Sequence, residues 1–272
     1  YNGGFVFPGA IDKVIMTEIR TNSLDKVRVF SIDIDEYTEF GLRENDAPTQ
    51  GWARYIFGVC REILKRGGKV ECFDAVFAGD IPLGAGLSSS AALESCFAFA
   101  LNDMYNGNAI DKFELARIGQ STEHNYCGVN CGIMDQFASV FGKKGNLMRL
   151  DCRSMEYEYF PFNPQGYKLV LLDSAVKHEL KDSPYNRRRE SCERVAKELG
   201  VTTLRDAAKS RITAEDYFRA KFVIEEKQRV LDVCDALNAG DYETVGRKMY
   251  ETHRGLSHDY EVSCEELDFL ND

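Results

Sequence analysis

Residues 80–94, DIPLGAGLSSSAALE, join a glycine-containing loop to three consecutive serines and then to residues that favour helix. Glycines allow the backbone to approach a ligand closely, and the first N–H groups of a helix have no partner within that helix. Together they form a site for an anion, most often phosphate. The hydroxyls of Ser88, Ser89 and Ser90 could bind phosphate oxygens or magnesium. A tight strand-to-helix turn with serine caps explains the same residues equally well.

Two common phosphate loops do not match this segment. The Walker pattern ends in G-K-[ST], whereas this loop contains no lysine. The dinucleotide-binding fingerprint requires a third glycine at the position that Ser89 occupies. Serine hydroxyls can donate hydrogen bonds and bind a metal, but they bring no charge. A phosphate in this loop therefore needs a cation from elsewhere.

Two carboxylates downstream of the loop are candidates for the same chemistry. Asp135, in CGIMDQF, falls in the first turn of a predicted helix, where a carboxylate also simply favours the helix dipole. Its functional interpretation is a base or charge partner for a substrate hydroxyl. Glu123 could supply an oxygen ligand to magnesium together with a serine hydroxyl, or it could be a solvated helix residue.

Other chemistry-bearing residues allow two interpretations. Trp52 and Tyr55, spaced i and i+3 in GWARYIFGV, could be core residues or a platform for adenine. The basic run 187–189 at a helix start needs compensation by phosphate or by neighbouring carboxylates, unless it is a solvated face. Cys127 and Cys131 could be half of a zinc site, but no second Cys/His pair at ligand spacing follows them.

The periodicity of the chain predicts the elements that position these residues. Apolar alternation at 69–78 predicts a strand, and the serine loop joins it to a helix that begins at Ser90. Pro161 and Pro164 mark the expected domain boundary. The other predicted elements are helices at 111–126, 133–141, 187–199, 215–238 and 242–253 and strands at 146–150 and 167–173. Asp111 is the expected N-cap of the first of these helices, with Glu114 at N3. The order of these elements predicts an α+β protein of two lobes, 1–163 and 164–272.

The composition excludes several classes of protein. The 272 residues are 44% hydrophobic and carry a formal charge of −10, which suits a globular protein and disfavours binding to nucleic acid. No apolar run reaches the ~18 residues of a membrane helix, and no secretory signal opens the chain. Nine scattered cysteines, an odd number, indicate reduced thiols and a cytoplasmic location.

Several motifs resemble one family. PLGAGLSSSAALE resembles the second motif of the GHMP small-molecule kinases, P-x-x-x-G-L-x-S-S-A, and CGIMDQF resembles the galactokinase family within them. The likeness continues through DSAVKHEL, SPYNRRRESCE and the segment 236–268. It implies a two-lobed α+β GHMP kinase fold, with a mixed sheet in the N-terminal lobe and a helix-rich C-terminal lobe. It also implies ATP-dependent phosphorylation of the C1 hydroxyl of D-galactose, giving galactose 1-phosphate and ADP.

The same resemblance implies roles for individual residues. Asp135 corresponds to the catalytic aspartate beside the anomeric hydroxyl, and Gly132 and Tyr185 correspond to sugar contacts. Ser90 and Glu123 correspond to the magnesium ligands. The residues implied in ATP binding are Gly84, Ala85, Gly86, Leu87, Ser88, Ser89 and Ser90 of the loop, with Trp52 and Tyr55 beside the adenine.

The resemblance leaves other functions open, and the chain departs from the family pattern at both ends. A kinase for N-acetylgalactosamine or arabinose fits the same motifs, and so does a non-catalytic galactose and ATP sensor. Such sensors lose residues of the serine loop, which is complete here. The chain begins inside the first family signature, at YNGG, and ends before the third, glycine-rich motif. We therefore expect these 272 residues alone to be inactive or weak, and to be a monomer with exposed sheet edges.

Overall fold

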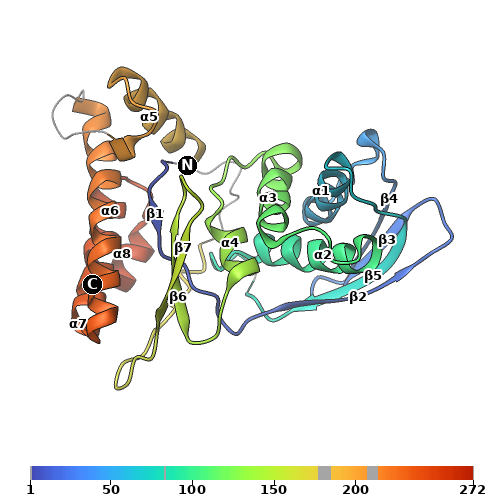
Figure 1. Ribbon diagram of the computed structural model, residues 1–272, viewed down its shortest axis with the longest axis horizontal. Coiled ribbons are helices and arrows are strands. Elements are labelled where there is room, and N and C mark those ends of the chain that lie inside the picture. Colours follow the sequence, from blue (N-terminus) through green and yellow to red (C-terminus); the bar gives the residue numbers. More distant parts are fainter. Residues whose placement is uncertain (1, 83, 177–184, 207–213, 272) are drawn as a thin grey trace. The chain divides into compact units, whose positions relative to one another are not determined.

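The computed structural model describes residues 2–82, 84–176, 185–206 and 214–271 (Figure 1). Its packing divides the chain into two compact units. One is the continuous segment Ile11–Phe141, and the other combines Tyr1–Ala10 with Gly142–Asp272. Mixed sheet and helix in the first unit, and helices with a small sheet in the second, agree with the predicted α+β class.

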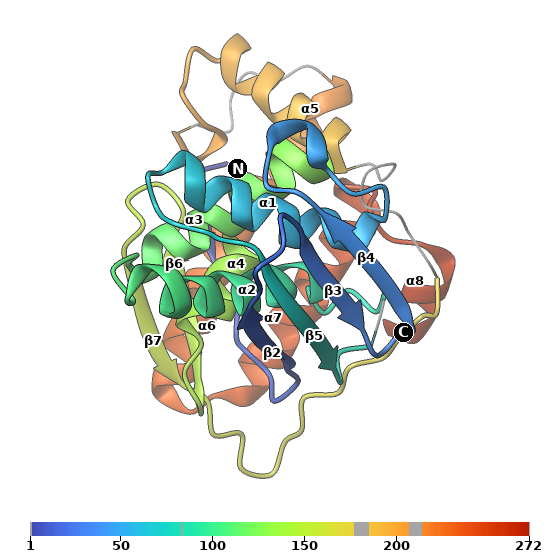
Figure 2. The same ribbon diagram turned by 90° about the vertical axis from the view of Figure 1, so that its right-hand side faces the viewer.

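The unit Ile11–Phe141 is built on a four-stranded sheet of order β2-β5-β3-β4, whose strands lie side by side in Figure 2. Strands β3 and β5 are parallel, and the other pairs are antiparallel. On β5 the predicted alternation is confirmed, because Phe73, Ala75 and Phe77 are buried. The strand bounds are Ile15–Thr21 for β2, Val27–Ser31 for β3, Glu36–Phe40 for β4 and Phe73–Gly79 for β5.

Helices lie against the buried face of this sheet (Figure 1). Fully buried aromatic side chains fill the layer between them, among them Phe57 of α1 and Phe97 of α2. The predicted cap is confirmed, since the Asp111 carboxylate accepts a hydrogen bond from the N–H of Glu114 at 3.0 Å. The elements are α1 (Gly51–Lys65), α2 (Ser89–Asn106), α3 (Lys112–Thr122), the π-helical turn η2 (Glu123–Cys127), α4 (Met134–Phe141) and the 3-10 turn η1 (Glu44–Asp46).

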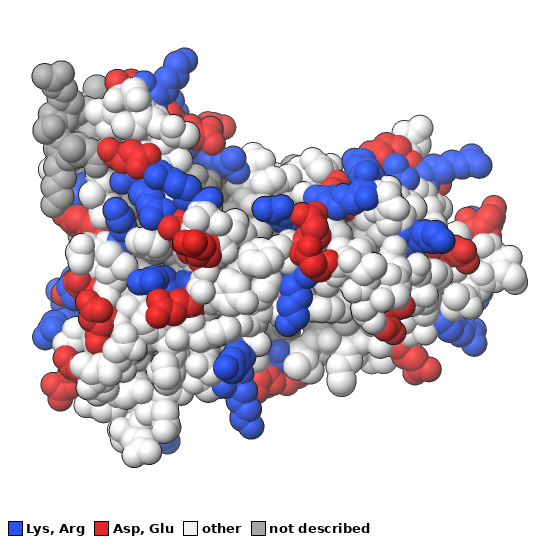
Figure 3. All heavy atoms as spheres, viewed as in Figure 1, with Lys and Arg blue, Asp and Glu red and all other residues white. Residues whose placement is uncertain are grey.

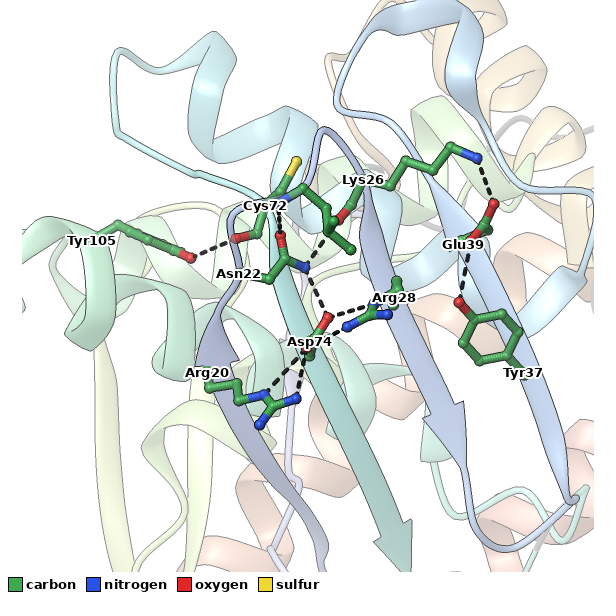
Figure 4. Close-up of polar contacts among 10 residues, drawn as sticks. Arg20, Asn22, Lys26, Arg28, Tyr37, Glu39, Cys72, Asp74 and Tyr105 are labelled. Carbon is green, nitrogen blue, oxygen red and sulfur yellow. Dashed lines mark hydrogen bonds and ion pairs between the residues drawn. The ribbon is translucent and has the colours of Figure 1, made fainter.

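The opposite face of the sheet is organised around Asp74 of β5 (Figure 4). Arg28 of β3 donates to both carboxylate oxygens at 2.7 Å, and Asn22 donates at 2.8 Å. Arg20, across the other edge of β5, adds a bond at 3.1 Å. These donors, Arg28 first, hold the pKa of Asp74 well below its usual range. One carboxylate therefore ties three neighbouring strands together.

We expect Asp74→Asn to lower the urea midpoint of unfolding at pH 7. A carboxyl whose pKa is lower in the folded state contributes stability above its ordinary pKa, and that contribution is lost as the pH falls. The difference between the variant and the wild type should therefore narrow below about pH 4. Arg20→Ala is the control and should change the midpoint little, because the Arg20 side chain is 78% exposed. A midpoint difference that stays constant with pH would contradict the role of the ionised carboxylate.

The second unit contains a three-stranded antiparallel sheet, β1-β6-β7, packed on α6. Asp151 at the end of β6 accepts from Arg205 at 2.5 Å, and Arg205 also donates to the carbonyl of Gly3 at 2.9 Å. The strands are β1 (Phe5–Val6), β6 (Asn146–Asp151) and β7 (Tyr157–Pro161). The helices are α5 (Tyr185–Glu198), α6 (Ala214–Ala239), α7 (Tyr242–Arg254) and α8 (Glu265–Asn271), with the turns η4 (Leu204–Asp206) and η5 (Gly255–Asp259).

The sequence predictions for this unit have mixed outcomes. The strand at 146–150 and the helices at 187–199, 215–238 and 242–253 are confirmed as β6, α5, α6 and α7. The strand predicted at 167–173 is wrong. These residues have no regular structure, and Val170 is 65% exposed. A continuous apolar run predicts a strand only where neighbouring strands pair with it and layers cover both faces. Among the described residues, none forms a strand that pairs with the segment 167–173.

The predicted lobe boundary after residue 163 differs from the packing division. Residues 1–10 and 142–163 belong with the C-terminal helices, because β1, β6 and β7 form one sheet that contacts α6. A compact unit defined by packing need not be the same as a domain. The lobes 1–163 and 164–272 therefore stay a prediction.

Candidate functional site

The backbone of the serine loop adopts left-handed conformations just before α2 begins. Gly84 and Gly86 have φ values of +78° and +71°, and in the described part of the chain, their sequence neighbours apart, no other residue lies within 4 Å of where their Cβ atoms would be. The helix begins at Ser89, one residue earlier than predicted, and the N-cap residue Ser88 has φ +57°. A left-handed conformation is uncommon for a serine and costs energy. The Ser88 side chain makes no cap hydrogen bond to α2, which disagrees with the interpretation of the serine as a simple cap.

The Ser88 hydroxyl instead lies close enough to Asp135, in the first turn of α4 as predicted, to affect its pKa. Burial raises the pKa of Asp135, and the hydrogen bond from Ser88 opposes part of that rise. The structure thus brings the serine loop and this carboxylate together within one unit. A carboxylate with a raised pKa is a stronger base than a solvent-exposed aspartate.

Glu123 lies at the same end of α2 and is buried, so its interpretation as a solvated helix residue is wrong. It stands where α3 changes into the π-helical turn η2. The Ser90 hydroxyl donates to Oε1 of Glu123 at 3.2 Å. Burial raises the pKa of Glu123, while the bond from Ser90 lowers it. The structure therefore brings together the two residues predicted as magnesium ligands.

Comparison with known proteins places this arrangement in a family. Residues 54–143 match the GHMP kinases N terminal domain. A galactokinase of Thermotoga petrophila is 41% identical over 100% of this chain and 77% of its own length. A galactokinase of Pyrococcus furiosus is 38% identical, over 99% and 76% respectively. The chain belongs to the galactokinase family.

Solved structures agree with this assignment. The galactokinase of Lactococcus lactis, complexed with galactose, matches with a TM-score of 0.87 and 30% identity over 99% of this chain and 73% of its own. The mevalonate kinase of Methanococcus jannaschii, at 17% identity and a TM-score of 0.60, shares the fold. The predicted GHMP kinase fold and the prediction of a kinase are thereby confirmed.

The residues of this galactokinase-family chain fit a magnesium ion held largely by substrate. Mg²⁺ usually takes one or two carboxylates together with substrate phosphates, rather than an all-protein cage. Ser90 and Glu123 supply a hydroxyl and one carboxylate beside the N-terminus of α2. Among the described residues, no group of three or more His, Cys, Asp or Glu side chains is arranged to hold a metal. Burial raises the pKa of the thiols of Cys127 and Cys131, and the nearby Glu123 carboxylate raises both further.

The remaining predicted site residues stay predictions. Trp52 donates from Nε1 to Glu36 at 2.6 Å and packs its ring 5.6 Å from that of Phe77. Burial raises the pKa of Tyr55. Gly132 precedes α4, and Tyr185 begins α5 in the other unit, with its side chain outside the described part.

The predicted basic run at the start of α5 has partners within its own unit. Arg188 donates from Nε to the carbonyl of Tyr260 at 2.6 Å. Arg189 pairs with the Glu193 carboxylate at 2.9 Å, one turn along the helix. A neighbouring carboxylate therefore compensates Arg189, as one of the two interpretations expected.

Two buried residues that the sequence did not single out join the site. The amide of Gln136 donates from Nε2 to Glu94 Oε2 and to Glu123 Oε1, at 3.1 Å in each case. Both side chains are almost completely inaccessible to solvent. Spacing could have identified Glu94, because it follows Ser90 by four residues on one helix and so lies on the same face. An acidic residue at a buried position is itself a signal.

Proposed function

We propose that the protein transfers the γ-phosphoryl group of ATP to the C1 hydroxyl of D-galactose, giving galactose 1-phosphate and ADP. The observation that carries this proposal is the bond from Ser90, at the start of α2, to the buried carboxylate of Glu123, with the Ser88 hydroxyl close enough to the half-buried Asp135 to lower its pKa. Because these residues belong to a single unit, they support a phosphate site and a base that act together. The Lactococcus lactis structure, which contains galactose, supports the choice of sugar.

The reaction forms a bond from the C1 oxygen to the γ-phosphorus and breaks the bond from that phosphorus to the β–γ bridging oxygen. The Asp135 carboxylate orients the C1 hydroxyl and accepts its proton. The loop 84–88 and the first N–H groups of α2 bind the phosphates. Ser90 and Glu123 would hold Mg²⁺, which would supply the positive charge that the loop lacks. Positioning and charge neutralisation provide most of the rate enhancement of phosphoryl transfer.

An assay of ADP release by the full-length protein tests this function. Galactose should be turned over well, and N-acetylgalactosamine and arabinose poorly. Faster turnover of either of these two sugars would assign the protein to a related sugar kinase. Binding of ATP and galactose without ADP release would identify a sensor and contradict the proposed enzyme.

The Ser88 hydroxyl is expected to influence how kcat/KM depends on pH. Because its hydrogen bond lowers the pKa of Asp135, Ser88→Ala should raise that pKa and move the acid limb of the kcat/KM profile to higher pH. Ser89→Ala is the control and should leave the acid limb in place, whatever its effect on rate. An unmoved limb in Ser88→Ala would show that the bond to Asp135 is absent from the working enzyme.

Three further observations bear on the proposed location and binding partners of the enzyme. The nine cysteines, all within the described residues, form no disulfide. The proposed location is the cytoplasm, where thiols stay reduced. No described helix has the length and apolar character that a bilayer crossing requires. On the face drawn in Figure 3, Lys and Arg side chains are interspersed with Asp and Glu rather than gathered into one broad patch. Galactose and ATP are the proposed partners, and the monomeric state stays a prediction.

A further inference from the structure

Gln136, in the first turn of α4, connects two buried carboxyl groups, those of Glu94 and Glu123. Its side chain is 1% exposed, and its Nε2 is 3.1 Å from both Glu94 Oε2 and Glu123 Oε1. An amide nitrogen has two N–H groups, so it can satisfy both acceptors at once. The orientation of Glu123 is therefore coupled to that of Glu94 through one amide.

Two further oxygens of this group have no hydrogen-bond partner within the described part of the chain. They are Oε1 of Glu94 and Oε1 of Gln136, and both are inaccessible to solvent. A buried acceptor without a donor costs about 1–3 kcal/mol, and an ionised carboxylate costs more. A proton on Glu94 would give these acceptors the donor that they lack, and an acid and an amide could then bond to each other twice.

The environment of Glu94 favours this neutral form. Burial is the largest cause that raises the pKa of Glu94, and the charges of Glu123 and Asp135 act in the same direction, so that the pKa stays well above its ordinary value although the bond from Gln136 lowers it. The facing helix α3 presents Gly119, whose added Cβ would lie 2.8 Å from Gln136 Cγ and 3.0 Å from Glu94 Oε2. Because α3 packs so closely, both side chains have little freedom to reorient.

We propose that Glu94 and Gln136 are positioning residues, in which Glu94, as a neutral carboxylic acid, holds the Gln136 amide so that its N–H fixes the Glu123 carboxylate for a divalent cation. This inference rests on the proposed role of Glu123 as a magnesium ligand. Neither residue contacts the reacting atoms. Their effect is on the affinity for the metal, in the way that outer-shell partners orient ligating side chains.

The test is the affinity of the full-length protein for Mn²⁺, measured by electron paramagnetic resonance with a non-hydrolysable ATP analogue present. Gln136→Met removes both N–H donors and is expected to weaken Mn²⁺ binding about 10–100-fold. Glu94→Leu should weaken it similarly. Glu94→Gln retains a neutral donor and acceptor of the same shape, so it should bind Mn²⁺ nearly as the wild type does. The KM for galactose should change little in all three.

Two outcomes would overturn the proposal. Wild-type Mn²⁺ affinity in a folded Gln136→Met variant would show that the amide does not position Glu123. A loss in Glu94→Gln as large as that in Glu94→Leu would show that Glu94 acts as an ionised carboxylate. If Gln136→Met does not fold, Gln136→Asn keeps the amide but is too short to reach both carboxyl groups, and the same loss of affinity is expected.

Controls separate metal affinity from stability and from the function itself. Asn102 is also buried on α2, where it bonds to the backbone of Ile110, so Asn102→Ala should lower the thermal midpoint without changing Mn²⁺ affinity. Glu123→Gln tests the ligand directly. Unchanged affinity in Glu123→Gln would reject the proposed metal site, whereas a loss there with none in Gln136→Met would reject only the positioning role.

Discussion

Asp135→Asn is expected to lower kcat by about 10²–10⁴-fold, the contribution of a positioned general base. Asparagine has nearly the same size and still accepts a hydrogen bond from Ser88, so the loop should retain its conformation. It cannot take the proton of the sugar hydroxyl. The dissociation constants for ATP and galactose should therefore stay close to those of the wild type. Isothermal titration and steady-state kinetics on the full-length protein measure the two quantities separately.

The pH profile adds a check on this assignment. Burial raises the pKa of Asp135, so the wild-type kcat/KM should fall on the acid side at a pH above the ordinary aspartate value of about 3.9. The base is active when deprotonated, and activity therefore rises with pH through that limb. Asp135→Asn should lack the limb. Nearly normal turnover in this variant would exclude Asp135 as the base.

Phe57→Ala is expected to reduce the free energy of unfolding by about 3–5 kcal/mol, as for other buried aromatic residues. The Phe57 ring is completely buried on α1. It makes edge contacts with Phe40 of β4 at 5.6 Å and with Tyr126 of η2 at 5.5 Å, measured between ring centroids. The alanine would leave a cavity where the helix, the sheet and the π-helical turn meet.

Urea unfolding followed by circular dichroism measures this loss. The matched control is Phe99→Ala on α2, which should cost much less because the Phe99 side chain is 37% exposed. Since η2 also carries Glu123, the Phe57 variant should bind Mn²⁺–nucleotide more weakly than the Phe99 variant does. Equal losses of stability in the two variants would contradict the role of Phe57 in this core.

Local sequence signals predicted much of the fold and the site. The strand β5, the Asp111 cap and the helices α5, α6 and α7 follow from periodicity and capping, which act over a few residues. The serine loop and the placement of Asp135 in a first turn were also predicted locally. The strand expected at 167–173 was not found, because strand formation depends on pairing with distant segments.

Other features of the site depend on the packing of whole helices. The sequence determined which residues could bind phosphate, hold a metal or accept a proton, since side-chain chemistry and helix starts are local properties. It left open whether the serines cap a turn and whether Glu123 is solvated. Tertiary structure decided both, by turning Ser88 toward Asp135 and by burying Glu123 against Ser90. It alone placed Gln136 between Glu94 and Glu123, because that contact requires α2, α3 and α4 to meet around Gly119.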